Sequence, residues 1–207
     1  EISTTFTPDV NDVVRTLAPG PDGTSVYVGG KFGSISGVPT FKIARLNVTT
    51  GAKVAGFNPP VVNAAVMDAR YASGRLFIGG LFTDIGGTPR TYLAELNPST
   101  GALKPDVNLA FAGLVWGGVG QVYKFDVSPN GNTMVVLGNF RTIDGQTRVQ
   151  VGKIDISTSP ATVINWATSK YDIKCGSSNN TKFDVRDVDI APDGSYLARS
   201  ASGAHTA

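Results

Sequence analysis

Short apolar segments that end in glycine recur along this chain and dominate its pattern. Three of them are Val26–Phe32, Leu76–Phe82 and Met134–Phe140, which read VYVGGKF, LFIGGLF and MVVLGNF. Their β-branched and aromatic residues are typical of strands that are buried on both faces. The segment Val185–Ile190 instead alternates apolar and polar residues, as a half-buried strand does. No segment follows the period of about 3.6 residues that marks a helix, so the pattern predicts an all-β fold.

These segments belong to a longer repeat. The first and second copies are offset by 50 residues and the second and third by 58, and the same offsets hold at several positions. The repeated positions are Phe32, Phe82 and Phe140, then Ile35, Ile85 and Ile143, then Gly37, Gly87 and Gly145. Two turn sequences recur as well: Pro-Asp-Gly or Pro-Asn-Gly at residues 21–23, 129–131 and 192–194, and an Asn-to-Gly turn at residues 47–51 and 97–101. Proline presets φ, the Asn side chain caps a turn, and glycine accepts the left-handed conformation.

Each repeat contains four predicted strands, and four strands in about 50 residues are typical of a β-propeller blade. We place blades at residues 10–60, 61–111 and 121–168, and the start of a fourth at 182–207. A closed propeller needs at least about four blades. Residues 1–207 are therefore expected to form a partial β-propeller of four-stranded antiparallel blades, an incomplete arc of about three and a half blades. The remaining blades of the same protein, or a second chain, would complete the ring.

Six repeated residues are interpreted as structural. Glycine inside a strand needs a reason, and the usual reasons are a bulge or a neighbouring backbone that approaches closely. This applies to Gly30, Gly80 and Gly138. The phenylalanines that follow, Phe32, Phe82 and Phe140, are expected to fill the space between blades, where truncation to alanine costs about 3–5 kcal/mol.

Composition and charge limit the classes of partner. Charged residues make up 16% of the chain, against roughly 25% in an average soluble domain. The 25 glycines and 12 prolines suit many short strands and tight turns. The net charge of +2 is spread along the chain without a run of Lys or Arg, which argues against nucleic acid and anionic membranes as partners. The longest uncharged stretch, 107–123, contains four glycines and is too short for a membrane-spanning helix.

Candidate catalytic groups are scarce. His205 and Cys175 are the only histidine and cysteine, so neither a Ser-His-Asp triad nor a zinc site of the usual ligands can be assembled within the chain. Asp184, Asp187 and Asp189 alternate with apolar residues, which indicates a strand rather than a calcium loop. We predict no metal, no cofactor and no catalytic residue, which favours a non-enzymatic function without deciding it.

Two further residues stand out. Cys175 has three interpretations: an inert buried thiol, half of a disulfide with a cysteine outside this chain, or a nucleophile. The last is disfavoured because the only histidine, His205, lies two residues from the end of the sequence. Trp116 lies in a long connection from Ala110 to Gln121, close to Phe111 and Tyr123. Exposed aromatic side chains on such loops stack on sugar rings or contact proteins, so Trp116 is the candidate ligand-binding residue. The alternative is that Trp116 packs beneath its own loop.

The residues of the first repeat also carry a family resemblance. The run VYVGGKF, followed by Ile-Ser-Gly, Ala-Arg-Leu-Asn and Thr-Thr-Gly-Ala, resembles the delta-60 type β-propeller repeat of secreted bacterial proteins, especially those of actinomycetes. The resemblance implies an extracellular propeller of about seven blades, in which a cysteine placed like Cys175 pairs with a downstream cysteine. The third repeat departs from the pattern at Leu137, Asn139 and Ser159.

These observations lead to three hypotheses of function. The leading one is an extracellular, non-catalytic binding or adhesion module with a glycan or a protein as its ligand. The first alternative is a carbohydrate-active hydrolase or lyase whose site lies at the mouth of the propeller channel. The second is an architectural subunit of a secreted or cell-surface assembly.

Overall fold

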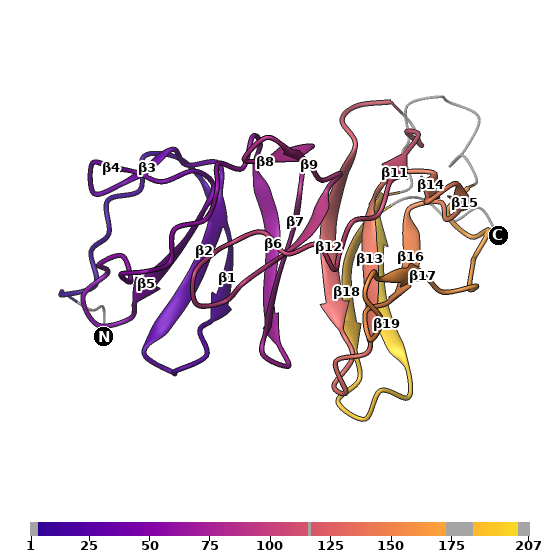
Figure 1. The fold of residues 1–207 in the computed structure, drawn as a ribbon. Coiled ribbons are helices and arrows are strands. Elements are labelled where there is room, and N and C mark those ends of the chain that lie inside the picture. The colour runs from indigo at the N-terminus through magenta and orange to yellow at the C-terminus, as the bar shows by residue number, and fades with distance from the viewer. Residues whose placement is uncertain (1–3, 116, 173–183, 203–207) are drawn as a thin grey trace. The chain divides into compact units, whose positions relative to one another are not determined.

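β-strands form every regular element in the computed structural model, which describes residues 4–115, 117–172 and 184–202 (Figure 1). The prediction of an all-β fold is confirmed. The chain forms two units, Glu1–Pro105 and Asp106–Ala207, and each is treated by itself below. Within the residues described, no helix is long and apolar enough to cross a membrane.

The first unit contains two antiparallel sheets of three strands. One sheet has the order β1 (Val14–Pro19), β2 (Ser25–Gly30), β5 (Ile43–Asn47), and the other has the order β6 (Val66–Ala72), β7 (Arg75–Gly80), β10 (Leu93–Leu96). A small hairpin accompanies each sheet: β3 (Ser34–Ile35) with β4 (Val38–Pro39), and β8 (Asp84–Ile85) with β9 (Thr88–Pro89). The repeat is therefore visible in the order of the strands.

The sequence predicts a fourth strand in each of these sheets. It is reduced to single bridges, from Leu46 to Lys53 and from Leu96 to Leu103. In the second repeat, Pro105 follows two positions after the bridged Leu103. Because proline has no backbone N–H, it cannot donate to a sheet ladder.

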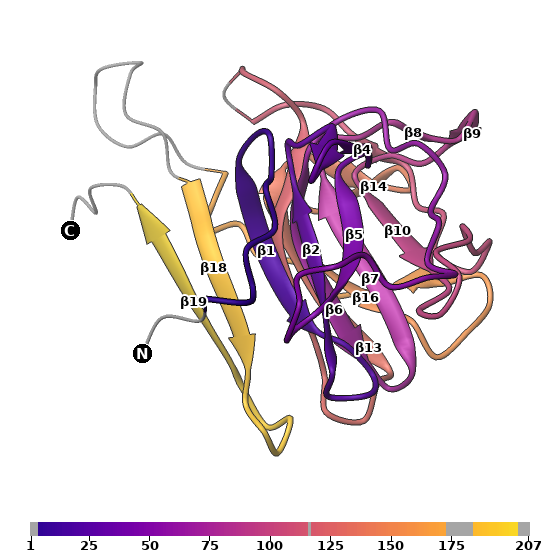
Figure 2. The same cartoon turned by 90° about the vertical axis from the view of Figure 1, so that its left-hand side faces the viewer.

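The second unit contains one complete four-stranded sheet. Its order is β12 (Gln121–Val127), β13 (Thr133–Asn139), β16 (Val151–Asp155), β17 (Thr162–Val163). A smaller sheet joins β11 (Phe111–Ala112), β14 (Thr142–Ile143) and β15 (Gln146–Thr147). The last hairpin pairs β18 (Asp184–Ile190) with β19 (Leu197–Ser202), as Figure 2 shows. The aspartate-rich segment thus forms a strand, as its alternating pattern predicted.

A bulge lies opposite the repeated glycines in the first strand of each sheet. The register of β1 shifts between Val14 and Thr16, where this strand faces Gly30 and Gly29, and the same shift recurs in β6 and β12. A Cβ atom on Gly30 would lie 2.2 Å from the carbonyl oxygen of Val13, and the corresponding separations are 2.2 Å at Gly80 and 2.0 Å at Gly138. Both usual reasons for glycine in a strand therefore apply at these three positions, where the backbone opposite the bulge lies too close for a Cβ atom.

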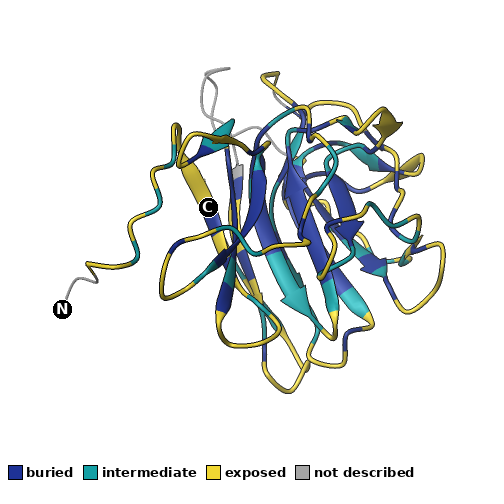
Figure 3. Ribbon diagram, turned by 60° about the vertical axis from the view of Figure 1, so that its left-hand side comes forward, coloured by how far each residue is buried: buried dark blue, intermediate teal, exposed yellow. Residues whose placement is uncertain are grey.

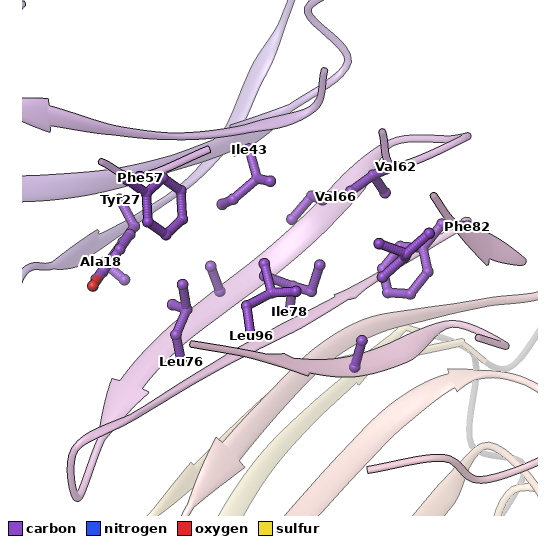
Figure 4. Close-up of a cluster of buried hydrophobic side chains, with 13 residues drawn as sticks. Ala18, Tyr27, Ile43, Phe57, Val62, Val66, Leu76, Ile78, Phe82 and Leu96 are labelled. Carbon is purple, nitrogen blue, oxygen red and sulfur yellow. The ribbon is translucent and has the colours of Figure 1, made fainter. Parts of the chain in front are cut away.

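The core of the first unit lies between its two sheets. Figure 3 shows the burial of the central strands, and in β7 every residue after Arg75 is buried. Figure 4 shows side chains from both sheets meeting in one cluster, which includes Tyr27, Phe57, Leu76 and Phe82. Phe32, Phe82 and Phe140 are all fully buried.

Candidate functional site

The candidate residues Trp116 and Cys175 lie outside the described residues, and so does His205. The residues on both sides of Trp116 are described, and they belong to a connection that distinguishes the third repeat. In the first two repeats, four positions separate an isolated bridge residue from the first paired residue of the next strand: Val10 from Val14, and Val62 from Val66. The equivalent residues of the third repeat, Phe111 and Val122, are eleven positions apart. We call residues 113–120 the inserted loop.

Asn139 anchors the inserted loop from the neighbouring strand β13. Its side-chain Oδ1 accepts a hydrogen bond from the amide of Val115 at 3.0 Å. Its Nδ2 donates to the carbonyl oxygens of Gly117 at 3.0 Å and Val119 at 3.1 Å. The equivalent positions in the other repeats hold Lys31 and Leu81, neither of which offers both a donor and an acceptor. The departure from the repeat at Asn139 is thus explained by the loop that it holds.

Arg141 holds the beginning of the same loop. Its Nε donates to the carbonyl oxygen of Leu114 at 3.2 Å, and its Nη1 forms an ion pair with Asp172 at 3.0 Å. Both charged side chains are roughly half exposed, so the ion pair adds little stability in water. In the orientation that forms this ion pair, the guanidinium also reaches the loop backbone.

The inserted loop combines buried and exposed apolar side chains. Val115 is buried, whereas Leu114 is 42% exposed and Val119 is 59% exposed. Phe111 precedes the loop in β11, and its ring packs edge-on against Phe140 with 5.0 Å between the centroids. Phe111 is buried, so its side chain extends the core and is not an exposed contact residue. Tyr123 lies at the bulge of β12 and is only partly buried.

The third strand of each repeat (β5, β10 or β16) carries a charged residue at its third position, and the surroundings of this residue differ between the repeats. Arg45 donates through Nη2 to Asp22 at 2.6 Å, across a turn of its own sheet. Glu95 is fully buried and pairs with Arg75, whose Nε lies 3.0 Å from Oε1, and with Lys104 at 3.3 Å. Lys153 has no carboxylate partner within the described part of the chain, and its ammonium lies 5.6 Å from the centre of the Trp166 ring. These partners come from other strands and turns, and the repeat pattern alone did not reveal them.

An open groove of about 460 Å³ lies beside β19 in the second unit. Its lining includes Asn130, Val135, Lys153, Asp193, Tyr196 and Leu197. Tyr196 is 67% exposed, and hydrogen bonds from the hydroxyl and the amide of Ser195 lower the pKa of Asp193. The groove therefore offers an aromatic face and a carboxylate that stays ionised at neutral pH.

The carboxyl groups with clear pKa shifts are not set for general acid catalysis. The Ser25 hydroxyl, followed by the Thr24 amide and the Arg45 guanidinium, lowers the pKa of Asp22 to about 2. The pKa of Asp155 is lowered in the same way by the Ser157 hydroxyl and amide. A carboxyl that acts as an acid near neutral pH needs a raised pKa instead. Within the described ranges, no three His, Cys, Asp or Glu side chains gather where a metal ion could bind.

Comparison with known families supports the architecture. The model of a family described as a "Domain of unknown function (DUF5122) beta-propeller" matches residues 21–49 and 72–103, which lie in the first two repeats. The fold is of the β-propeller type. No curated protein sequence matches the chain.

Solved structures show the same architecture and no more. One of the 110 chains that match comes from "Kuenenia stuttgartiensis Hydrazine Synthase", with a TM-score of 0.51 and 14% sequence identity. The similarity covers 91% of this chain and 43% of that chain, so this chain spans less than half of the matched protein. At this identity the likeness concerns the fold alone, and a fold shared so widely does not specify a ligand.

Proposed function

We propose that this chain is a non-catalytic binding or adhesion module that acts outside the cell and takes a glycan or a protein through the inserted loop. The observation that carries the proposal is the anchoring of this loop by Asn139. The extracellular location rests on the sequence resemblance to secreted bacterial propeller repeats.

The length of the inserted loop supports a role beyond connection. Four positions suffice to join the equivalent strands in the other repeats, yet the third repeat uses eleven. Ordering each extra residue costs about 1–2 kcal/mol of backbone entropy, so a loop with no role would be expected to stay short or loose. The side chain of Asn139 instead makes three hydrogen bonds to the loop backbone. Such an arrangement reduces the entropy that a ligand would otherwise have to remove on binding.

The residues of the inserted loop also suit a contact surface. Leu114 and Val119 expose apolar area, and Trp116 lies between them in the sequence. Tryptophan is enriched among the few interface residues that supply most of the binding energy, and an indole also stacks on the apolar face of a sugar ring. Loops held on a rigid β scaffold are common sites of binding.

The test is a binding screen with matched variants. The unchanged chain and two variants, Trp116→Ala and Asn139→Leu, are each applied to an array of immobilised glycans and to purified surface proteins of the source organism. Leucine is the residue that the second repeat carries at the position of Asn139, so this change removes the loop anchor and keeps the strand pattern. We expect one ligand class to bind, with affinity at least about tenfold weaker, or 1.4 kcal/mol, in both variants.

The control is Tyr196→Ala, which removes an exposed aromatic ring from another part of the second unit. It should bind as the unchanged chain does. Binding that survives Trp116→Ala, or the lack of any binding on both arrays, contradicts the proposal.

A further inference from the structure

A pocket of about 280 Å³ lies in the first unit, beside the beginning of β5. All of its lining residues fall between positions 39 and 61, so it is formed by the first repeat and the segment that leads to the second. Its walls are mostly apolar, with Phe41, Pro59 and Val61 among them, and its polar side chains are those of Thr40, Lys53 and Asn58. The other repeats show what the chain places at the equivalent positions.

An arginine holds the position of Thr40 in the second and third repeats. These residues are Arg90 and Arg148, and both are buried. Arg90 donates hydrogen bonds to the carbonyl oxygens of Pro89 at 2.8 Å and Lys104 at 3.4 Å. Arg148 donates to the two equivalent carbonyl oxygens at 2.7 and 3.0 Å. Each guanidinium therefore connects the beginning of the third strand with the residue that follows the fourth-strand pairing.

The first repeat supplies its cation from the fourth-strand position instead. Lys53 Nζ donates a hydrogen bond of 2.9 Å to Thr40 Oγ1, and this hydroxyl donates to the carbonyl oxygen of Val38. The positions equivalent to Lys53, which pair with the third strand in the same way, hold Leu103 and Val163. The first repeat thus has a small residue where the others have arginine, and a cation where they have an aliphatic residue. Because threonine is much shorter than arginine, this exchange leaves room for a pocket.

Lys53 gives the pocket a positive charge without a counter-charge. Its ammonium forms no ion pair within the described part of the chain, and no acidic residue lines the pocket. An ammonium carries three N–H donors, of which Thr40 accepts one. The side chain of Asn58 makes no hydrogen bond to a described residue, so its amide is available to a ligand. A half-buried cation beside apolar walls favours an anionic ligand, because water solvates the charge incompletely there.

The apolar walls of the pocket are accessible and rigid. Phe41 is 44% exposed and Val61 is 49% exposed. The positions equivalent to Phe41 hold Thr91 and Val149, so this ring is particular to the first repeat. The three prolines of the lining have fixed φ angles, so these walls lose little conformational entropy when a ligand binds. Such a surface suits a flat apolar ring, which can pack against the phenylalanine.

We propose that this pocket binds a small organic acid, a carboxylate carried on a single compact apolar ring. The carboxylate accepts hydrogen bonds from the ammonium of Lys53 and the amide of Asn58, and the ring lies against Phe41. The volume of about 280 Å³ is close to the lower limit of about 300 Å³ for ligand pockets, which fits a ligand of one ring. A sugar fits less well, since most of its hydroxyl groups would face apolar walls without a partner. This site shares no residue with the inserted loop and is additional to the binding site proposed above.

The test is a titration of the full chain, followed through the amide signals of two-dimensional NMR spectra. The probes are benzoate, the neutral benzamide, which has the same ring, and acetate, which lacks the ring. We expect benzoate to bind about fivefold more tightly than either of the other two probes. The signals that shift should be those of Thr40, Phe41, Lys53 and Val61.

Two variants that carry residues of the second repeat make the test specific. Lys53→Leu removes the ammonium, so the preference for benzoate over benzamide should fall below about twofold. Thr40→Arg combined with Lys53→Leu reproduces the second repeat, in which backbone carbonyls hold the arginine. The guanidinium should then fill the pocket, so benzoate should not bind, while the midpoint of urea denaturation stays unchanged or rises. Lys31→Leu is the matched control, because it also replaces a lysine by the residue of the second repeat, and it should bind benzoate as the unchanged chain does.

Several outcomes would overturn the proposal. These are equal affinity for benzoate and benzamide, shifts confined to other parts of the chain, a preference that survives Lys53→Leu, or benzoate binding that survives the double change. A lowered urea midpoint of the double variant would also overturn it, since the arginine would then not take the place that it has in the second repeat.

A further probe separates a free acid from an acidic side chain of a protein. Glutamate with acetylated and amidated backbone groups presents its carboxylate as a protein does, and it should bind no more tightly than acetate. If it binds more tightly than benzoate, the pocket takes an acidic protein segment and the proposal is wrong. The Trp116→Ala variant should bind benzoate unchanged, so failure of the proposed function would not affect this test.

Discussion

The buried hydroxyl of Tyr27 should make the stability of the first unit sensitive to alkaline pH. Tyr27 is fully buried, and its hydroxyl donates a hydrogen bond of 2.6 Å to the carbonyl oxygen of Pro98. Its ring lies 5.4 Å from the ring of Phe57. Burial disfavours the phenolate and raises the pKa of Tyr27 from 10.0 to about 12.

The magnitude follows from this difference in pKa. Because the folded-state pKa is the higher one, Tyr27 contributes stability that is complete below pH 10 and is lost as the pH rises through 12. Each pKa unit corresponds to about 1.36 kcal/mol, so the full loss is about 2.7 kcal/mol. The hydrogen bond to Pro98 adds about 1 kcal/mol while the hydroxyl is protonated.

The measurement compares the unchanged chain with Tyr27→Phe, using urea denaturation followed by circular dichroism at pH 8 and pH 11.5. At pH 8 the unchanged chain should be about 1 kcal/mol more stable than the variant, and at pH 11.5 it should be about 1 kcal/mol less stable. The two proteins should be equally stable at about pH 10.6. The comparison cancels the ionisation of other groups, which both proteins share.

Tyr196→Phe is the matched control, because Tyr196 is 67% exposed and loses the same hydroxyl. Its effect on stability should not change with pH. If the difference between the unchanged chain and Tyr27→Phe also stays constant from pH 8 to pH 11.5, Tyr27 ionises equally in both states and the reasoning from burial is refuted.

Three further changes test other parts of the fold by urea denaturation. Phe82→Ala removes a fully buried ring and should cost about 3–5 kcal/mol; a loss below about 1 kcal/mol would show that Phe82 does not fill the core. Gly80→Ala places a Cβ atom 2.2 Å from the carbonyl oxygen of Ala65 and should cost about 1–3 kcal/mol, whereas Gly33→Ala has its nearest neighbour at 3.9 Å and should be nearly neutral. Equal effects of the two alanines would contradict the close approach. Glu95→Gln leaves two cations without their buried carboxylate and should cost about 2 kcal/mol at pH 7, and an unchanged midpoint would refute a stabilising network.

Features that depend on short stretches of sequence were the ones that could be predicted. Asn47 shows this, because its side chain accepts the amides of Thr49 and Thr50 and Gly51 adopts a φ of 71°, as the turn sequence indicated. The repeated order of strands likewise followed from spacing, since each blade is built from strands that are consecutive in the chain. The spacing of the repeat did not indicate that the fourth strands of the first two repeats are reduced to single bridges.

Features that depend on distant partners were not predictable in the same way. The long connection around Trp116 was evident from its length, but its anchor was not, since Asn139 reaches the amide of Val115 across 24 positions. The departure of Asn139 from the repeat was the available signal. The burial of Phe111 was not predictable either, because no nearby residue indicates its contact with Phe140, which forms only when β11 pairs with β14.

The varied charges of the third strands have a consequence for how a repetitive chain folds. Repeats with similar strands risk pairing a strand with the wrong blade during folding. Were β10 to replace β5 beside β2, Glu95 would meet Asp22, and in the reverse exchange Arg45 would meet Arg75. Both exchanges bring like charges together in partly buried places, where repulsion is strong. The ion pairs thus favour correct strand pairing, because each stabilises the third strand of its own repeat over the similar third strand of another repeat.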